Sequence, residues 1–218
     1  MPEQNKTFST RRFRWLSFKL YHNYLVHSRH NVDHLGFAFF LFAGLLTLLA
    51  AWEWPTVLEL LGAIHNLALA VIYMHRLPAT SHDRTGLWLG LIAAVLPIPF
   101  SPMGLSLLFT LVGIVAYALI LWSLLTLRGR FGIAPADRGL ATSGPYRFIR
   151  HPMYLGELAL RFALLAGTGI DASPLQKVLL FAVALGLQIV RLRREERIIS
   201  GYGDYMTQVQ WRLVIGLY

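Results

Sequence analysis

Two short polar stretches stand out in a chain that is otherwise strongly hydrophobic. The first, residues 144–156, reads GPYRFIRHPMYLG and places a turn, three basic side chains and a proline directly before an apolar run. Pro152 suits the first position of a helix, and the residue before a proline is pushed toward an extended conformation. His151 is therefore expected beside the positive end of this helix, where a carboxylate or phosphate is favoured.

The second polar stretch contains Arg191 and Glu195, which are four residues apart and so share one helix face, with Glu196 beside them. A guanidinium and a carboxylate one turn apart could divide the recognition of a ligand. Glu195 would receive an ammonium, and Arg191 would bind a carboxylate with two hydrogen bonds. The alternative is that RLRREER is a solvated cluster that ends a membrane helix.

A further charged pair, Glu157 and Arg161, lies near the start of an apolar segment. Ionisable side chains inside a membrane are costly and usually face a polar interior, so these two residues either line a cavity or extend to the membrane surface. Arg147 and Arg150 are explained by the excess of basic residues on the cytoplasmic side of membrane proteins. We therefore leave both arginines out of the predicted site.

The elements that must position these residues are membrane helices. The chain is 56% hydrophobic and only 14% charged. Six apolar segments are long enough to be considered as membrane spans, and their approximate ranges are 35–52, 56–74, 85–96, 103–127, 153–170 and 175–190. The sequence thus predicts an all-α, polytopic helical bundle.

The distribution of basic residues predicts the orientation of this bundle. All of the 20 lysine and arginine residues except Arg161 and Lys177 fall in segments on one side of the membrane. The positive-inside rule places that side, both termini and the site in the cytoplasm, with a bacterial inner membrane as the expected location. Three regions follow: a basic interfacial segment (1–34), four membrane helices (35–127), and a region with two further helices and a C-terminal cytosolic lobe (128–218).

Several classes of function are disfavoured by what the sequence lacks. There is no cysteine, which excludes thiolate nucleophiles and thiolate metal sites, and no other metal site is expected. His65 and His75 are ten apart on one helix and do not face the same ring, so haem is not expected. GYG at 201–203 is not a dinucleotide fingerprint, no soluble basic fold could carry nucleic acid, and the N-terminus lacks the pattern of a cleaved signal peptide.

The C-terminal part of the chain resembles the isoprenylcysteine carboxyl methyltransferase family, which is related to the phospholipid N-methyltransferases. The resemblance is carried by GRFGIAPADRGLATSGPYRFIRHPMYLGE and RLRREERIISGYGDYMTQVQWRLVIGLY. It implies an integral membrane enzyme that binds S-adenosylmethionine in a cytosol-facing pocket built by the last helices. The residues that the resemblance places against this cofactor are Arg138, Gly139, Leu140, Ala141, Tyr146, His151, Pro152, Met153, Tyr154 and Glu195.

The resemblance also assigns Arg191 to the substrate, and two departures from the family pattern concern the C-terminal lobe. The gap from Glu196 to Gly203 is one residue short, and Ile215 stands where a proline is common. The lobe is therefore expected to differ in shape. The N-terminal segments, which vary within the family, are expected to shape substrate access.

The expected reaction is methyl transfer from S-adenosylmethionine to a lipophilic acceptor from the bilayer, with S-adenosylhomocysteine as the product. A carboxylate of an isoprenoid or isoprenylcysteine-like molecule, oriented by Arg191, needs no general base. For a phosphatidylethanolamine-type amine a proton must leave, and Glu157 is the candidate group that assists. An NADPH-dependent membrane sterol reductase and a non-catalytic scaffold are more distant alternatives. The expected partners are the lipophilic acceptor and membrane lipid, without nucleic acid.

Overall fold

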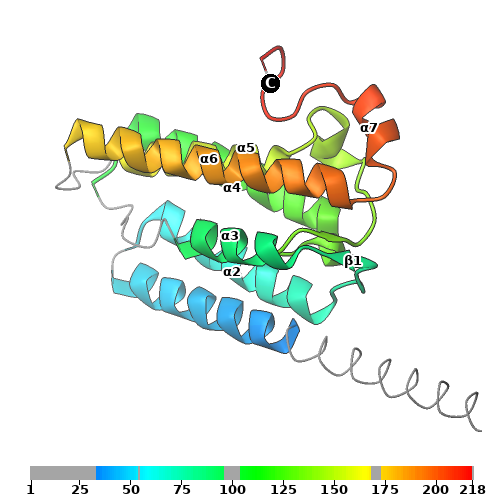
Figure 1. Cartoon of the computed structure of the whole chain (residues 1–218). Helices are drawn as coiled ribbons and strands as arrows, with labels where there is room; N and C mark the ends of the chain where they lie inside the picture. The colour runs from blue at the N-terminus through cyan, green and yellow to red at the C-terminus, as the bar shows by residue number, and fades with distance from the viewer. Residues whose placement is uncertain (1–32, 54, 96–103, 168–172, 218) are drawn as a thin grey trace, which may run out of the picture.

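A computed structural model describes residues 33–53, 55–95, 104–167 and 173–217 of the chain. The predicted interfacial segment lies almost entirely outside the described residues. Helices dominate the described part, with one antiparallel pair of two-residue strands (Figure 1). The α-helices are Asp33–Glu53, α2 (Val57–Met74), α3 (Arg84–Val95), α4 (Leu107–Leu127), α5 (Pro152–Gly167), α6 (Pro174–Ile198) and α7 (Tyr202–Gln208). The short elements are η1 (Arg128–Arg130), η2 (Gly144–Arg147), β1 (Ser81–His82) and β2 (Ala136–Asp137).

Each of the six predicted apolar segments contains a helix, which confirms the all-α bundle. In the described part of the chain, four helices are long and apolar enough to cross a membrane: Asp33–Glu53, Val57–Met74, Leu107–Arg130 and Pro174–Ile198. The helices α3 and α5 are shorter, at 12 and 16 residues. The residues that follow each of them, 96–103 and 168–172, lie outside the described part.

Local sequence signals set several helix starts. The helix α5 begins at Pro152, as predicted, because its fixed φ angle and missing N–H are compatible with the first helical turn. At the start of α6, Ser173 and Gln176 form a reciprocal capping box, and Pro174 occupies the first helical position. Because the capping box marks the first turn of α6, the polar stretch with Arg191 and Glu195 lies at the C-terminal end of this helix.

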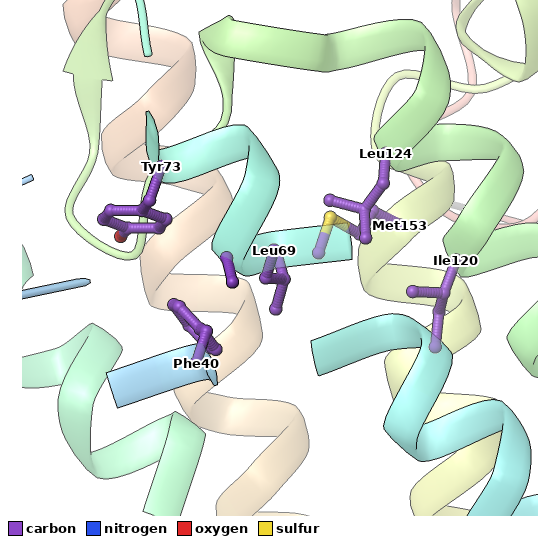
Figure 2. Close-up of a cluster of buried hydrophobic side chains, with 7 residues drawn as sticks. Phe40, Leu69, Tyr73, Ile120, Leu124 and Met153 are labelled. Carbon is purple, nitrogen blue, oxygen red and sulfur yellow. The ribbon is translucent and has the colours of Figure 1, made fainter. Parts of the chain in front are cut away.

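A hydrophobic core fastens the first turn of α5 to its neighbours. Met153 packs in one buried cluster with Ile120 and Leu124 of α4, and the same cluster continues to Phe40, Leu69 and Tyr73 (Figure 2). Gly156 allows α5 to approach α4 closely, since a Cβ there would lie 2.7 Å from the Ile120 side chain. The start of α5, where the site residues lie, is therefore held on a rigid support.

The C-terminal lobe folds back onto the polar end of the bundle, where α7 and β1 lie (Figure 1). Gly201 has a φ of 76°, a left-handed conformation that glycine adopts without strain, and it turns the chain from α6 into α7. Beyond α7, the carbonyls of Trp211 and Arg212 accept hydrogen bonds from the amides of Arg150 (2.8 Å) and His151 (2.9 Å). The last residues are thus tied to the segment that precedes α5.

Candidate functional site

A cavity lies where the end of α4, the loop around β2, η2, the first turn of α5, the end of α6 and α7 meet. About 730 Å³ of empty space lies between its lining residues, and this volume includes open solvent. The residues predicted from the resemblance to hold a cofactor line this cavity, with one exception. They are Arg138, Gly139, Leu140, Ala141, Tyr146, His151, Met153, Tyr154 and Glu195. The exception, Pro152, is fully buried at the start of α5.

Asp137 fastens the loop that carries Arg138–Ala141 to the turn after α6. One oxygen of its buried carboxylate accepts the Gly139 amide at 3.1 Å, and the other accepts the Ser200 amide at 3.1 Å and the Ser200 hydroxyl at 2.6 Å. These hydrogen bonds lower the pKa of Asp137, and the one from the Ser200 hydroxyl has the largest effect. Asp137 was not predicted, because its partner Ser200 is 63 residues away in the sequence.

We expect Asp137→Asn to lower the free energy of unfolding by about 1–3 kcal/mol, because an amide NH₂ would face the Ser200 donors and leave them unpaired. The lowered pKa means that the carboxylate stabilises the fold above the ordinary aspartate pKa of about 4, and that this contribution is lost as the pH falls through the lowered value. Thermal melts of variant and wild type across this range should differ most near neutral pH. A difference that does not change with pH would contradict the role of the charge.

His151 lies between two tyrosine rings. Its imidazole stacks on Tyr154 (ring centroids 5.6 Å apart) and on Tyr202 of α7 (6.1 Å). Its Nε2 lies 2.9 Å from the Tyr202 hydroxyl and 3.3 Å from Glu196 Oε1. Glu196 already supplies a carboxylate to His151, and the His151 amide donates to the Arg212 carbonyl. That this position favours an external anion stays a prediction.

Glu196 joins three segments through buried ion pairs. Its side chain is 7% exposed, and its Oε1 lies 3.0 Å from Arg150 Nη1 and 3.2 Å from Arg212 Nε. The interpretation of Arg150 as a residue of membrane topology alone is therefore wrong, since Arg150 is buried, pairs with Glu196 and lines the cavity. Arg147 differs from Arg150 because it is exposed and lies over the Phe148 ring.

Glu195 provides the cavity with a carboxylate. Its side chain is 22% exposed, accepts a hydrogen bond from the Tyr154 hydroxyl, and has an oxygen 3.8 Å from His151 Nδ1. Among the residues that line the cavity, Glu195 is the one acidic side chain. The prediction that Glu195 receives a cationic group is thus compatible with its position.

The cavity wall around Glu195 contains tyrosines that stay uncharged. Burial, followed by the nearby Glu195 carboxylate, raises the pKa of Tyr146 well above its ordinary value. Burial also raises the pKa of Tyr205 to about 12, and the Tyr205 hydroxyl donates to the Tyr146 carbonyl. Burial and then Glu196 raise the pKa of Tyr202. The wall therefore offers neutral hydroxyls and aromatic rings at every physiological pH.

Glu157 and Arg161 form an ion pair (3.3 Å) within the bundle, and neither lines the cavity. Arg161 also donates to the Ala93 carbonyl at 2.8 Å, while Gln188 of α6 donates to Glu157. The two residues thus pair with each other, but neither of the two alternatives holds as stated, because the pair does not line the described cavity and its contacts with Ala93 and Gln188 hold it inside the bundle. The position of Glu157 beside a bound acceptor remains a prediction.

Arg191 is buried and does not line the cavity directly. Its Nη1 donates to Gln188 Oε1 at 3.1 Å, its Nη2 donates to the Ile133 carbonyl at 3.2 Å, and its guanidinium lies 5.0 Å from the centre of the Tyr154 ring. The alternative that Arg191 belongs to a solvated cluster is therefore wrong. Arg191 lies behind Tyr154 and connects the cavity wall to the Glu157 pair through Gln188.

The fold and the site together define a polytopic membrane protein with a cavity at one end of its bundle. Residues 103–204, slightly less than half of the chain, match the family model described as phospholipid methyltransferase (PEMT). No curated protein matches the chain significantly. The matched region contains every residue that lines the cavity except Tyr205. The match therefore supports a membrane methyltransferase that acts on lipid-like substrates.

Proposed function

We propose that the protein transfers a methyl group from S-adenosylmethionine to a lipophilic acceptor. The observation that carries this proposal is the cavity itself, which lies almost entirely within the region that matches the methyltransferase family. Its lining combines one carboxylate, Glu195, with neutral tyrosines and with the guanidinium groups of Arg130, Arg138 and Arg150. A cofactor with an ammonium and a sulfonium fits such a wall, because carboxylates and tyrosine rings both attract cations. When bound, S-adenosylmethionine would supply an activated methyl group.

The residues that would hold the cofactor are Glu195, the tyrosines of the wall, His151 and the loop Arg138–Ala141. Their task is alignment and exclusion of water, which together can lower a barrier by several kcal/mol. The stack of Arg191, Tyr154, His151 and Tyr202 fixes these side chains before a ligand enters. Such preorganisation supports a reaction whose methyl group is already activated.

Two acceptors are compatible with this site. A carboxylate of an isoprenoid or isoprenylcysteine-like molecule would have to be bound by Arg191. The Arg191 guanidinium has further N–H groups besides those that donate to Gln188 and to the Ile133 carbonyl. The amine of a phospholipid is favoured by the description of the matching family. For that amine, Glu157 would assist loss of the proton, with Gln188 holding its carboxylate in place.

The proposed activity is tested by equilibrium binding and by labelling. The purified protein should bind S-adenosylhomocysteine tightly and NADPH weakly. Membranes that contain it should incorporate label from methyl-labelled S-adenosylmethionine into an extractable lipid, whose identification would name the acceptor. Tight binding of NADPH, or absence of S-adenosylhomocysteine binding, would contradict the proposal and favour the reductase or the scaffold alternative.

We expect Arg191→Ala to reduce turnover with a lipid acid by about 100-fold, because a small misplacement of the reacting groups is enough for such a loss. The affinity for S-adenosylhomocysteine should fall much less, since Arg191 does not line the cavity. Rates of label transfer and calorimetric affinities measure the two effects. Arg193→Ala is the matched control, because Arg193 is exposed on the same helix. Unchanged turnover in Arg191→Ala would exclude the role.

A further inference from the structure

The arginines that line the cavity differ in what they bind within the protein. Arg138 donates through its Nε to the Leu77 carbonyl at 3.1 Å, and Arg150 pairs with Glu196 at 3.0 Å. The third is Arg130, whose Nε is buried and has no hydrogen-bond acceptor among the described residues. Within that part of the chain its side chain also forms no ion pair. Of these three arginines, Arg130 therefore has the guanidinium that can still bind an anion.

The backbone on both sides of Arg130 is held in place. Arg130 ends η1, the short turn that follows α4. Before it, the Gly129 carbonyl accepts the Leu77 amide at 2.8 Å, and a Cβ on residue 129 would lie 2.5 Å from the His75 carbonyl oxygen. After it, Phe131 packs against the buried cluster of Figure 2. The Arg130 side chain therefore extends from a fixed point at the edge of the cavity.

The Arg130 guanidinium lies beside the loop that the resemblance assigns to the cofactor. A Cβ on residue 139 would lie 3.6 Å from Arg130 Nε, which is van der Waals contact, and both residues line the cavity. Asp137 ties the same loop to Ser200, in the turn after the helix that carries Glu195. A cationic side chain and a carboxylate thus line one cavity, on segments that are tied together.

The amino-acid end of S-adenosylmethionine carries one ammonium and one carboxylate. Both groups lose water when they enter a cavity, and each then needs a partner of opposite charge or a hydrogen bond. Glu195 is available for the ammonium. The carboxylate needs donors, and the His151 amide already donates to the Arg212 carbonyl. A planar guanidinium matches a carboxylate through two parallel hydrogen bonds, so Arg130 fits this group.

We propose that Arg130 binds the carboxylate of S-adenosylmethionine while Glu195 receives its ammonium. The inference rests on the proposed methyltransferase function and adds to it the residue that recognises the acidic group of the cofactor. Its basis is the buried, unpartnered Nε of Arg130 in the described part of the chain, together with the contact between Arg130 and Gly139. Arg130 thereby distinguishes the complete cofactor from an adenosine thioether that has no carboxylate.

The test measures the affinity of the full chain in detergent for two ligands by calorimetry. One is S-adenosylhomocysteine, and the other is its decarboxylated analogue, which keeps the adenosine and the ammonium. Wild type should bind S-adenosylhomocysteine about tenfold more tightly, the effect of a hydrogen bond between charged groups. Arg130→Gln should bind both ligands about equally. Arg128→Gln is the matched control and should keep the preference, because Arg128 is exposed on the same turn and does not line the cavity.

A second variant tests the geometry of the contact and the stability of the fold. Arg130→Lys keeps the positive charge but replaces the planar fork by a point charge, so its preference for S-adenosylhomocysteine should lie between those of wild type and Arg130→Gln. A preference equal to that of wild type in Arg130→Lys would contradict the paired hydrogen bonds. This variant also tests the proposal if Arg130→Gln does not fold.

Other outcomes separate the proposal from its alternatives. Equal binding of the two ligands by wild type would overturn it. A preference retained in Arg130→Gln would also overturn it, even if both affinities fell together, and would favour the start of α5 at His151 as the carboxylate site. If Arg130→Gln kept the preference and weakened the binding of dihexanoyl phosphatidylethanolamine, Arg130 would belong to the acceptor instead. Absence of S-adenosylhomocysteine binding in wild type would refute the proposed function itself, whereas binding without a preference would refute only the role of Arg130.

Discussion

Replacing Glu195 by glutamine is expected to weaken the binding of S-adenosylmethionine by about 10- to 100-fold, the effect of losing a hydrogen bond to a charged group. Glu195 is the one acidic side chain among the residues that line the cavity, and the tyrosines around it are uncharged. No other carboxylate lines the cavity to replace its negative charge. Calorimetry in detergent would measure this change.

The loss should be larger for S-adenosylmethionine than for S-adenosylhomocysteine, because only the former carries a sulfonium. Asp204→Asn is the matched control, since it removes the same charge from an exposed position on α7 and Asp204 does not line the cavity. Unaltered affinity of Glu195→Gln for both ligands would count decisively against the proposed cation site.

The second large effect is expected from Glu196→Gln, which should lower the free energy of unfolding by about 3–5 kcal/mol. Glu196 pairs with Arg150 and Arg212 and contacts His151, and its side chain is almost fully buried. Removing its charge would leave Arg150 buried without a counter-ion. In a protein of this size the melting temperature should fall by about 10 °C.

Two further variants separate the ion pair from packing. Arg147→Gln, which removes an exposed positive charge from the same motif, should leave the melting temperature unchanged. Arg150→Met combined with Glu196→Leu should recover part of the loss, because replacing both members of a buried pair with apolar groups is often tolerated. A melting temperature of Glu196→Gln that matches wild type would show that these contacts contribute little to stability.

Much of the candidate site could be predicted because its residues are close in sequence. Tyr146, His151 and Tyr154 lie within nine residues, and the turn and the helix start at Pro152 bring them to one place. The loop Arg138–Ala141 precedes them directly. The pattern that identified these residues describes one continuous stretch of chain, and all of them line the cavity.

Arg150 shows where this approach failed. In the sequence it resembles Arg147, since both are basic residues before an apolar helix. Their environments differ because the C-terminal segment and Glu196 cover Arg150 and leave Arg147 exposed. Whether a charged side chain is buried depends on segments distant in sequence that pack over it. The positive-inside rule describes only which side of the membrane a residue lies on and carries no information about such packing.

The sequence by itself determined that the protein is a bundle of membrane helices, because long uncharged segments leave the backbone no other way to satisfy its hydrogen bonds in lipid. It also determined where α5 and α6 begin, through their prolines and the capping box. Only the tertiary structure decided that Asp137 reaches Ser200 and that Glu196 neutralises Arg150. These contacts join residues 46 and 63 positions apart, and helical periodicity relates only residues within a few turns of one another.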